Sequence, residues 1–270
     1  MSTKDNVKMS FLDHLEVLRW VLIRSALFLI AGAVLVFTFM DFVFNTILLG
    51  PSQENFLTNR FFAWLAIQLD IPSLKINATI IRIQNIDMAG QFTTSVTIAL
   101  VGGLIIAFPF IFWEFWKFIK PALKEKEVKH AGGAIFAVSS LFFVGILFGY
   151  YLISPLSIDF LVNYKISEVV ENIIGLDSYI STVMSIVLAG GLIFELPVFI
   201  YFLSKVGIVS AKFLSTYRRH AIVIITIVAA IITPPDVVSQ MMVEIPLLIL
   251  YEIGILVAKN IEKNRRLKAN

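Results

Sequence analysis

Hydrophobic positions along the chain form long runs separated by polar segments. A bilayer core about 30 Å thick needs roughly 20 apolar residues in a helix, so these runs predict membrane-spanning helices rather than core helices of a soluble domain. No charge falls between Asp87 and Glu114 or between Lys129 and Asp159. We therefore expect an all-α integral membrane protein with six spans, over residues 20–42, 96–118, 131–153, 179–204, 219–233 and 237–258.

We expect the last two helices to be short, and the fifth run is the clearest case. Its apolar part covers residues 221–233, which as a helix reach about 20 Å, less than the hydrocarbon core. Two readings are open: neighbouring protein shields the ends of this helix, or the bilayer thins beside a site where polar cargo passes.

The segment over residues 43–95 is the longest between two predicted spans. Residues 59–69 carry apolar side chains at helical spacing, which fits an amphipathic helix lying on the membrane interface or a short helix packed inside an outer cap. Residues 74–83 alternate and weakly predict a strand. The two halves of the chain show no internal repeat of the kind found in many secondary transporters.

Composition supports the membrane assignment. Hydrophobic residues make up 58% of the chain and charged residues 15%, against about 25% charged in a soluble domain, which excludes a typical soluble enzyme. The net charge of +3 is too small to indicate nucleic-acid binding. Without cysteine there is no thiol chemistry, and the three histidines are far apart, so we expect no metal site and no cofactor.

The distribution of basic residues predicts the orientation. Residues 1–19 are polar and lack the features of a cleavable signal, and six spans return the chain to the side on which it starts. Of the 22 Lys and Arg residues, only Arg60, Lys75, Arg82 and Lys165 fall on the outer side if the N-terminus is inside. The positive-inside rule therefore predicts a single polytopic domain, residues 1–270, with both termini cytoplasmic.

The fourth and sixth predicted spans contain three acidic residues: Glu195 in the fourth, and Glu244 and Glu252 in the sixth. A charge at mid-bilayer costs at least about 2.5–3.5 kcal/mol, so such acids face the bundle interior or a wet cavity. Pro197 and Pro246 follow two of them closely and free carbonyls for other partners. The open alternatives are interhelical hydrogen bonds, a proton or ion relay, and a polar docking point.

Acids also lie among the lysines of the inner segments. Asp13 and Glu16 precede the first span, and Glu125 and Glu127 follow the second. Viewed alone, these segments have the composition of solvated, positively charged loops. The alternative is a carboxylate pocket for a guanidinium group, because the two pair through parallel hydrogen bonds, with Phe118 and Pro121 as an apolar wall.

Several motifs in order resemble one family. They are FLDHLEVLR near the N-terminus, FWEFWKFIKPALKEKE after the second span, FELPVF in the fourth span, and TPPDVVSQ followed by IPLLILYEIGI. From about Phe11 to Lys259 the chain resembles the TatC family, the multi-spanning subunit of the twin-arginine protein translocase.

The resemblance implies a function without covalent chemistry. The family recognises signal peptides that carry two adjacent arginines and passes folded proteins across the membrane using the proton-motive force. It implies a receptor and core subunit in the inner membrane of a prokaryote, in an oligomer of heteromeric units. Its partners would be signal peptides, single-span subunits and the bilayer. The alternatives are a proton-coupled small-solute transporter using Glu195 and Glu244, and an insertase or scaffold without arginine preference.

The resemblance also implies site residues. Glu127 matches the loop acid that holds arginine, helped by Glu125 and Glu16, and Phe118 and Pro121 match the neighbouring wall. Arg19 is expected in the same signal-peptide site. Glu195 matches an intramembrane polar position. On the outer face, structural roles are implied for Pro51, Pro234, Pro235, Asp236 and Gln240.

The chain departs from the family pattern at two positions. Val17 stands where an acid is usual, and Glu16, one residue away, lies about 100° around a helix from it. Glu244 stands where an apolar or small residue is expected.

Overall fold

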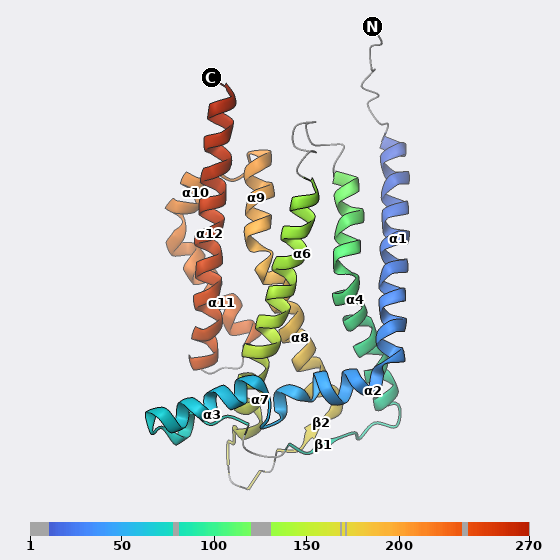
Figure 1. Ribbon diagram of the computed structural model, residues 1–270, viewed down its shortest axis with the longest axis vertical. Coiled ribbons are helices and arrows are strands. Elements are labelled where there is room, and N and C mark those ends of the chain that lie inside the picture. Colours follow the sequence, from blue (N-terminus) through green and yellow to red (C-terminus); the bar gives the residue numbers. More distant parts are fainter. Residues whose placement is uncertain are drawn as a thin grey trace. The chain divides into compact units, whose positions relative to one another are not determined.

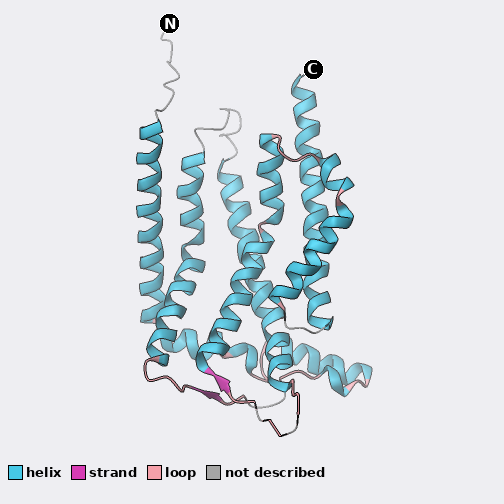
Figure 2. Cartoon of the chain, turned by 180° about the vertical axis from the view of Figure 1, so that it is seen from behind, coloured by secondary structure: helices cyan, strands magenta, loops and turns pink. Residues whose placement is uncertain are grey.

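The chain forms long helices with little other regular structure (Figures 1 and 2). The computed structural model describes residues 11–77, 81–119, 131–167, 169–170, 172–233 and 237–269. The chain divides into two compact units. Unit 1 comprises Met1–Phe39 and Val96–Ser139, and unit 2 comprises Met40–Ser95 and Ser140–Asn270.

Unit 1 is built on α1 (Phe11–Thr38) and α4 (Gly90–Ile119). The two helices approach closely at a pair of glycines, where a Cβ atom on Gly32 would lie 2.7 Å from the carbonyl oxygen of Gly103. Beside this contact, Phe28 and Phe110 stack with ring centroids 5.3 Å apart. Small residues that let backbones meet are the usual packing device of membrane helices, because lipid supplies no hydrophobic drive between them.

Unit 2 holds the remaining elements. Its helices and strands are α2 (Met40–Phe42), α3 (Leu57–Leu69), β1 (Ile83–Gln84), α6 (Ala131–Phe148, from Ser140 onward), α7 (Ser154–Asn163), β2 (Ile174–Gly175), α8 (Leu176–Phe194), α9 (Leu196–Val206), α10 (Ala211–Thr216), α11 (Arg218–Ile232) and α12 (Val237–Ala269). Short π-helical or 3₁₀ turns occupy Val43–Leu48, Gly50–Ser52, Pro72–Leu74 and Gly149–Ile153. The core of unit 2 includes Ile186, Ala229 and Leu247, so α8, α11 and α12 share it.

Within the described residues, five stretches are long and apolar enough to cross a membrane. They are Leu15–Thr38, Gly90–Phe118, Ile135–Asn163, Leu176–Val206 and Gln240–Arg265. Each overlaps one of the predicted spans, and the helices extend beyond the predicted limits because their polar end residues continue the backbone hydrogen bonding. The remaining predicted span, 219–233, corresponds to α11, a helix of 15 residues.

The structure differs from three sequence expectations. Of the two final helices predicted to be short, only α11 is short, because α12 continues through the polar residues that follow the span and has 33 residues. The fourth predicted span is two helices, because Glu195 ends α8 and Pro197 lies in the first turn of α9, where its missing N–H is tolerated.

The strand predicted over residues 74–83 is wrong for the described part. Only Ile83 enters a strand, and Asn77 has a positive φ of 51°. The Asn77 side chain donates hydrogen bonds to carbonyls of Pro51 and Pro155, which holds the chain in a turn.

Candidate functional site

A groove runs between α1 and α4 in unit 1. It has a volume of 320 Å³ and is lined by Val17, Trp20, Val21 and Arg24 from α1 and by Glu114, Lys117 and Phe118 from α4. The four α1 residues are spaced so that they share one helix face. The chain passes from α4 into residues 120–130 directly beyond Phe118, so the groove lies next to the segment in which the sequence predicts recognition acids.

A buried carboxylate organises the charges of this groove. Glu114 is 5% exposed. Its Oε2 lies 3.4 Å from Nη1 of Arg24, and its Oε1 lies 2.5 Å from Nζ of Lys117. Lys117 also lies over the ring of Trp113, 4.7 Å from its centroid. Because two half-exposed cations, Arg24 and Lys117, surround one carboxylate, the part of the groove at Glu114 has a net positive charge.

Sequence reasoning missed the role of Glu114. The structure pairs Arg24 of α1 with Glu114 of α4. The sequence signal for this pair was that a basic residue, Arg24, lies shortly after the start of one apolar run and an acidic residue, Glu114, lies shortly before the end of the next. Antiparallel neighbours bring two such positions to the same depth.

Only some of the predicted recognition residues line the groove. Phe118 lines the groove, whereas Glu16 and Arg19 are exposed on α1 and do not line it. Val17 occupies the position on the α1 face that meets α4. Arg19 lies over the ring of Trp20, with Cζ 5.7 Å from the centroid. Six other predicted residues lie outside the described part of the chain: Pro121, Glu125, Glu127, Pro234, Pro235 and Asp236.

Glu195 is the most enclosed acid of unit 2. It sits at the break between α8 and α9 and is 5% exposed. Its carbonyl oxygen accepts hydrogen bonds from the backbone N–H groups of Val198 and Phe199, at 2.9 and 3.0 Å. Its carboxylate lies beside the backbone of Phe142, and neither oxygen makes a hydrogen bond of normal geometry with the described part of the chain. A buried carboxylate with so few partners has unused hydrogen-bonding capacity.

The other two intramembrane acids join α11 to α12. The Thr226 hydroxyl donates to Oε1 of Glu244 at 2.6 Å, and the Gln240 amide donates to the carbonyl of Thr226 at 3.4 Å. Glu252 accepts two hydrogen bonds from Arg218, at 2.7 and 2.8 Å. Both acids therefore have interhelical partners, and within the described residues no hydrogen bond links Glu244 to Glu195.

Pro51 lies at the centre of a hydrogen-bonded turn. It is fully buried, and its carbonyl accepts from the amides of Asn59 and Asn77 at 3.0 and 3.3 Å. Asn59 also donates to the carbonyl of Gln53 at 2.7 Å. Two side chains, from α3 and from the turn at Asn77, thus hold the backbone at the proline and shortly after it.

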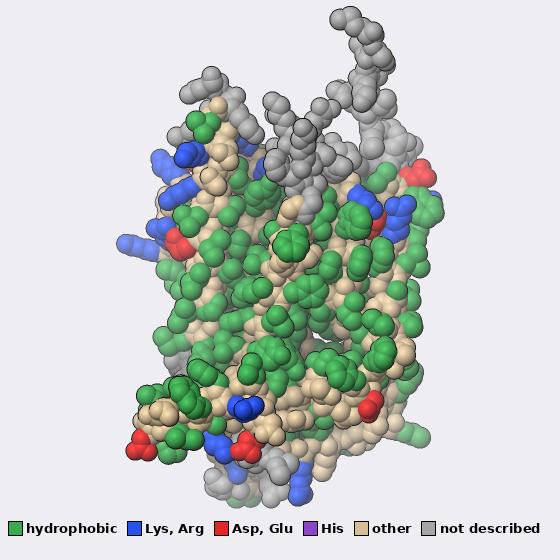
Figure 3. Space-filling model, in the orientation of Figure 1, with side chains coloured by type: hydrophobic (Ala, Val, Ile, Leu, Met, Phe, Trp, Pro, Cys, Tyr) green, Lys and Arg blue, Asp and Glu red, His purple; other side chains and the backbone are tan. Residues whose placement is uncertain are grey.

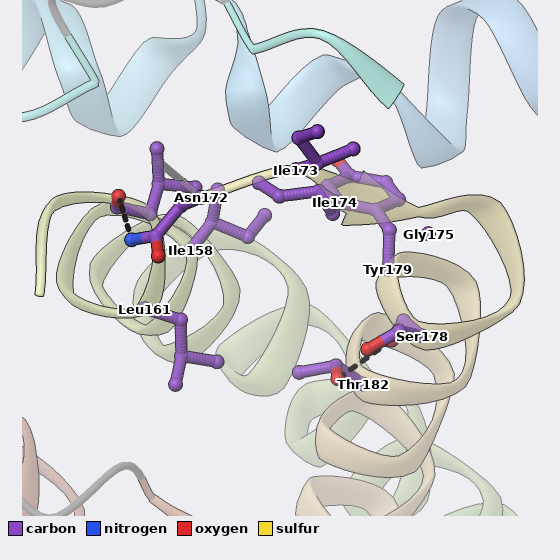
Figure 4. Close-up of a pocket in the computed structure, with 10 residues that line it drawn as sticks. Ile158, Leu161, Asn172, Ile173, Ile174, Gly175, Ser178, Tyr179 and Thr182 are labelled. Atoms are coloured by element: carbon purple, nitrogen blue, oxygen red, sulfur yellow. Dashed lines mark hydrogen bonds between the residues drawn. The ribbon is translucent and has the colours of Figure 1, made fainter. Parts of the chain in front are cut away.

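A second cavity, of 380 Å³, lies between α7, β2 and α8 in unit 2 (Figure 4). Isoleucines and Leu161 form much of its wall. Its polar side chains Asn172, Tyr179 and Thr182 donate hydrogen bonds to backbone carbonyls of unit 2. This cavity has no charged lining residue among those described, so it lacks the chemistry for a guanidinium group.

The fold and the buried acids define the class: this is an all-α multi-pass membrane protein with five long apolar helices. The family model for TatC, Sec-independent protein translocase protein, matches residues 13–246. The chain therefore belongs to the TatC family. It is a TatC subunit of the twin-arginine translocase, a transport protein and not an enzyme.

Relatives cover almost the whole chain. Sec-independent protein translocase protein TatC of Blattabacterium sp. subsp. Periplaneta americana is 40% identical over 260 residues, which cover 96% of this chain and 98% of the relative. The protein of the same name from Aquifex aeolicus is 32% identical, covering 93% and 95%. A crystal structure of the twin arginine translocase receptor TatC in DDM superimposes with a TM-score of 0.70 at 31% identity, covering 91% of this chain and 99% of that chain.

These comparisons confirm the family and the function predicted from the sequence motifs. They favour the protein translocase over the small-solute transporter. The transporter alternative uses Glu195 and Glu244 as a proton relay, but within the described residues Glu244 accepts a hydrogen bond from Thr226 and none links it to Glu195.

Proposed function

We propose that this subunit binds twin-arginine signal peptides at the cytoplasmic face of the inner membrane of a prokaryote and takes part in the export of folded proteins driven by the proton-motive force. The observation that carries the proposal is the groove between α1 and α4, which joins an apolar wall to a charged end beside residues 120–130. Family membership supplies the class of ligand, and the groove supplies a place for it.

The topology that we propose has six spans and both termini in the cytoplasm, in a single polytopic domain. Its support is the uneven distribution of Lys and Arg. α11 would be the sixth crossing helix besides the five long ones. Its 15 residues reach about 22 Å, so its ends need local thinning of the bilayer or shielding by neighbouring helices.

Recognition would be shared between loop acids and the groove. Glu127, helped by Glu125 and by Glu16 at the start of α1, would hold the signal's arginines at the membrane surface. Arg19 would belong to the same signal-peptide site. A charge-assisted hydrogen bond contributes about 1.5–3 kcal/mol. Phe118 and Pro121 would form the apolar wall, and the signal's apolar stretch would continue along the groove past Trp20 and Val21.

Other partners would bind elsewhere on the subunit. The buried carboxylate of Glu195 is a docking point for a polar group on a single-span translocase subunit, and subunits of both kinds would assemble into an oligomer of heteromeric units. Pro51, Pro234, Pro235, Asp236 and Gln240 would keep structural roles at the outer face, since Pro51 and Gln240 already lie in hydrogen-bonded contacts between elements.

The first test replaces the loop acid. Glu127→Arg should abolish export of a twin-arginine precursor and weaken binding of its signal peptide about 10- to 100-fold, because repulsion replaces a charge-assisted pair. The measurements are precursor export in cells and peptide affinity for the purified complex, with membrane insertion checked by immunoblot. Asp87→Arg, at an exposed position in the loop before α4, is the matched control and should export normally. Normal export by an inserted Glu127→Arg variant would remove this assignment.

Crosslinking distinguishes the remaining alternative. A photoreactive residue at position 118 or 127 should crosslink to an Arg-Arg signal peptide and much less to its Lys-Lys counterpart, because only guanidinium pairs bidentately with carboxylate. Equal crosslinking of both peptides would favour an insertase or scaffold.

A further inference from the structure

The helix α3 has an unusual distribution of polar and apolar residues. It buries Thr58 and Asn59 beside Phe62 and Ala66. Four of its exposed large apolar side chains lie close together around the helix: Leu57 at 66%, Phe61 at 55%, Trp64 at 55% and Ile67 at 78%. We call these four the exposed face of α3. At 100° per residue they fall within about a third of the helix circumference. In water such a stripe of aromatic and aliphatic side chains is unfavourable, so its presence points to a partner.

The opposite face fixes α3 to the ends of the spans in unit 2. Phe62 packs in one cluster with Leu156 of α7, against Leu152 and Met242. The Thr58 hydroxyl donates to the carbonyl of Tyr151. Met242 lies close to the N-terminal end of the apolar stretch Gln240–Arg265. α3 is therefore level with this end of the span.

The direction of α3 matches this position. In both ribbon views it lies across the ends of the unit 2 helices rather than along them (Figures 1 and 2). The space-filling view shows hydrophobic side chains gathered over α3 and over the adjoining part of unit 2 (Figure 3). On α12, Met241 and Ile245 are both 55% exposed, and in a membrane protein such span residues face lipid. The exposed face of α3 thus continues a lipid-facing surface.

We propose that α3 lies in the membrane interface, with its exposed face inserted at the boundary between headgroups and acyl chains, so that the partner of this surface is the bilayer itself. Interfacial helices insert their apolar face by about 5–10 Å, and tryptophan is favoured at this depth. Arg60 is exposed within the same third of the helix circumference, and its side chain is long enough to reach lipid phosphate.

This anchoring has a consequence for the Pro51 turn. Asn59, on the buried face of α3, holds the carbonyls of Pro51 and Gln53. A helix kept at one depth by lipid therefore fixes the depth of that turn relative to the membrane. The inference goes beyond signal-peptide recognition and does not depend on it.

Spin labelling tests the proposal directly, because the natural chain has no cysteine. Full-length single-cysteine variants Phe61→Cys and Trp64→Cys are labelled and reconstituted into phospholipid liposomes. Asn55→Cys, exposed in the loop before α3, is the aqueous control. Labels at 61 and 64 should collide with oxygen several-fold more than with a water-soluble nickel chelate, and the ratio should reverse at 55.

Two outcomes would overturn the proposal. Nickel access at 61 and 64 equal to that at 55 would place the exposed face in water. Low access to both reagents at 61 and 64 would mean that a second copy of the chain covers this face instead of lipid. Circular dichroism of each labelled variant verifies that its helices are intact.

Discussion

Single residues of this protein are constrained chiefly by the cost of burying charge. Glu114 is nearly enclosed, and Arg24 and Lys117 compensate its charge from two helices. Removing Glu114 takes the shared carboxylate partner from both cations, whereas removing Arg24 leaves Glu114 paired with Lys117. The exposed pair of Glu54 and Lys75, at 2.8 Å, is the opposite case. The hydrogen bond from Lys75 lowers the pKa of the Glu54 carboxyl, but solvent screens the pair.

A double-mutant cycle tests this difference at the residue scale. Glu114→Ala should lower the free energy of unfolding by about 1.5–3 kcal/mol, the range for hydrogen bonds to charged groups. Arg24→Ala should cost less, because Lys117 still pairs with the carboxylate. The double variant should cost little more than Glu114→Ala alone. Titration with SDS in mixed micelles measures all three.

Glu54→Ala serves as the control and should change stability little. Strict additivity of Arg24→Ala and Glu114→Ala would show that the two side chains do not interact.

At the scale of elements, glycine contacts set how closely the helices pack. In unit 2 a Cβ atom on Gly190 of α8 would lie 2.6 Å from the carbonyl oxygen of Gly145 of α6, and one on Gly145 would lie 2.8 Å from Cβ of Phe194. Both partners are backbone or stem atoms that cannot rotate away. The approach of α6 to α8 therefore depends on the absence of side chains at these positions.

A pair of glycine variants in one helix tests the packing. Gly145→Ala should lower stability by about 1–3 kcal/mol because it overpacks the α6–α8 contact. Gly133→Ala, where the new Cβ meets nothing within 4 Å, should be neutral or stabilising by up to about 1 kcal/mol through helix propensity. Thermal denaturation in detergent measures both, and equal effects of the two variants would contradict the role of the close contact.

For the whole molecule, orientation decides whether the recognition segment meets newly made cargo. In intact cells, a membrane-impermeant maleimide should label Asn55→Cys and should not label Lys126→Cys until the membrane is opened. The reason is the concentration of Lys and Arg on the side of residues 120–130. Labelling of position 126 from outside would show that the topology is the reverse of the one proposed, and it would exclude a receptor on the cytoplasmic side.

Prediction from sequence succeeded where the signal is local. Apolar runs located all five long helices, because the free energy of transferring about 20 residues into lipid depends on those residues alone. Ordered motifs identified the family. The same reasoning failed at residues 74–77, where partners distant in sequence hold Asn77 in a turn. It also left both readings of residues 59–69 open.

What the sequence alone determined is the membrane character of the chain, its long helices and its family, since each follows from neighbouring residues. Only the tertiary structure decided that Arg24 pairs with Glu114, 90 positions away, that Val17 rather than Glu16 lines the groove, and that α3 buries Thr58 and Asn59 while it exposes an apolar stripe. These features depend on which helix faces meet. Apolarity along a span is nearly uniform, so the pattern indicates that a helix crosses lipid without indicating which side faces a neighbour.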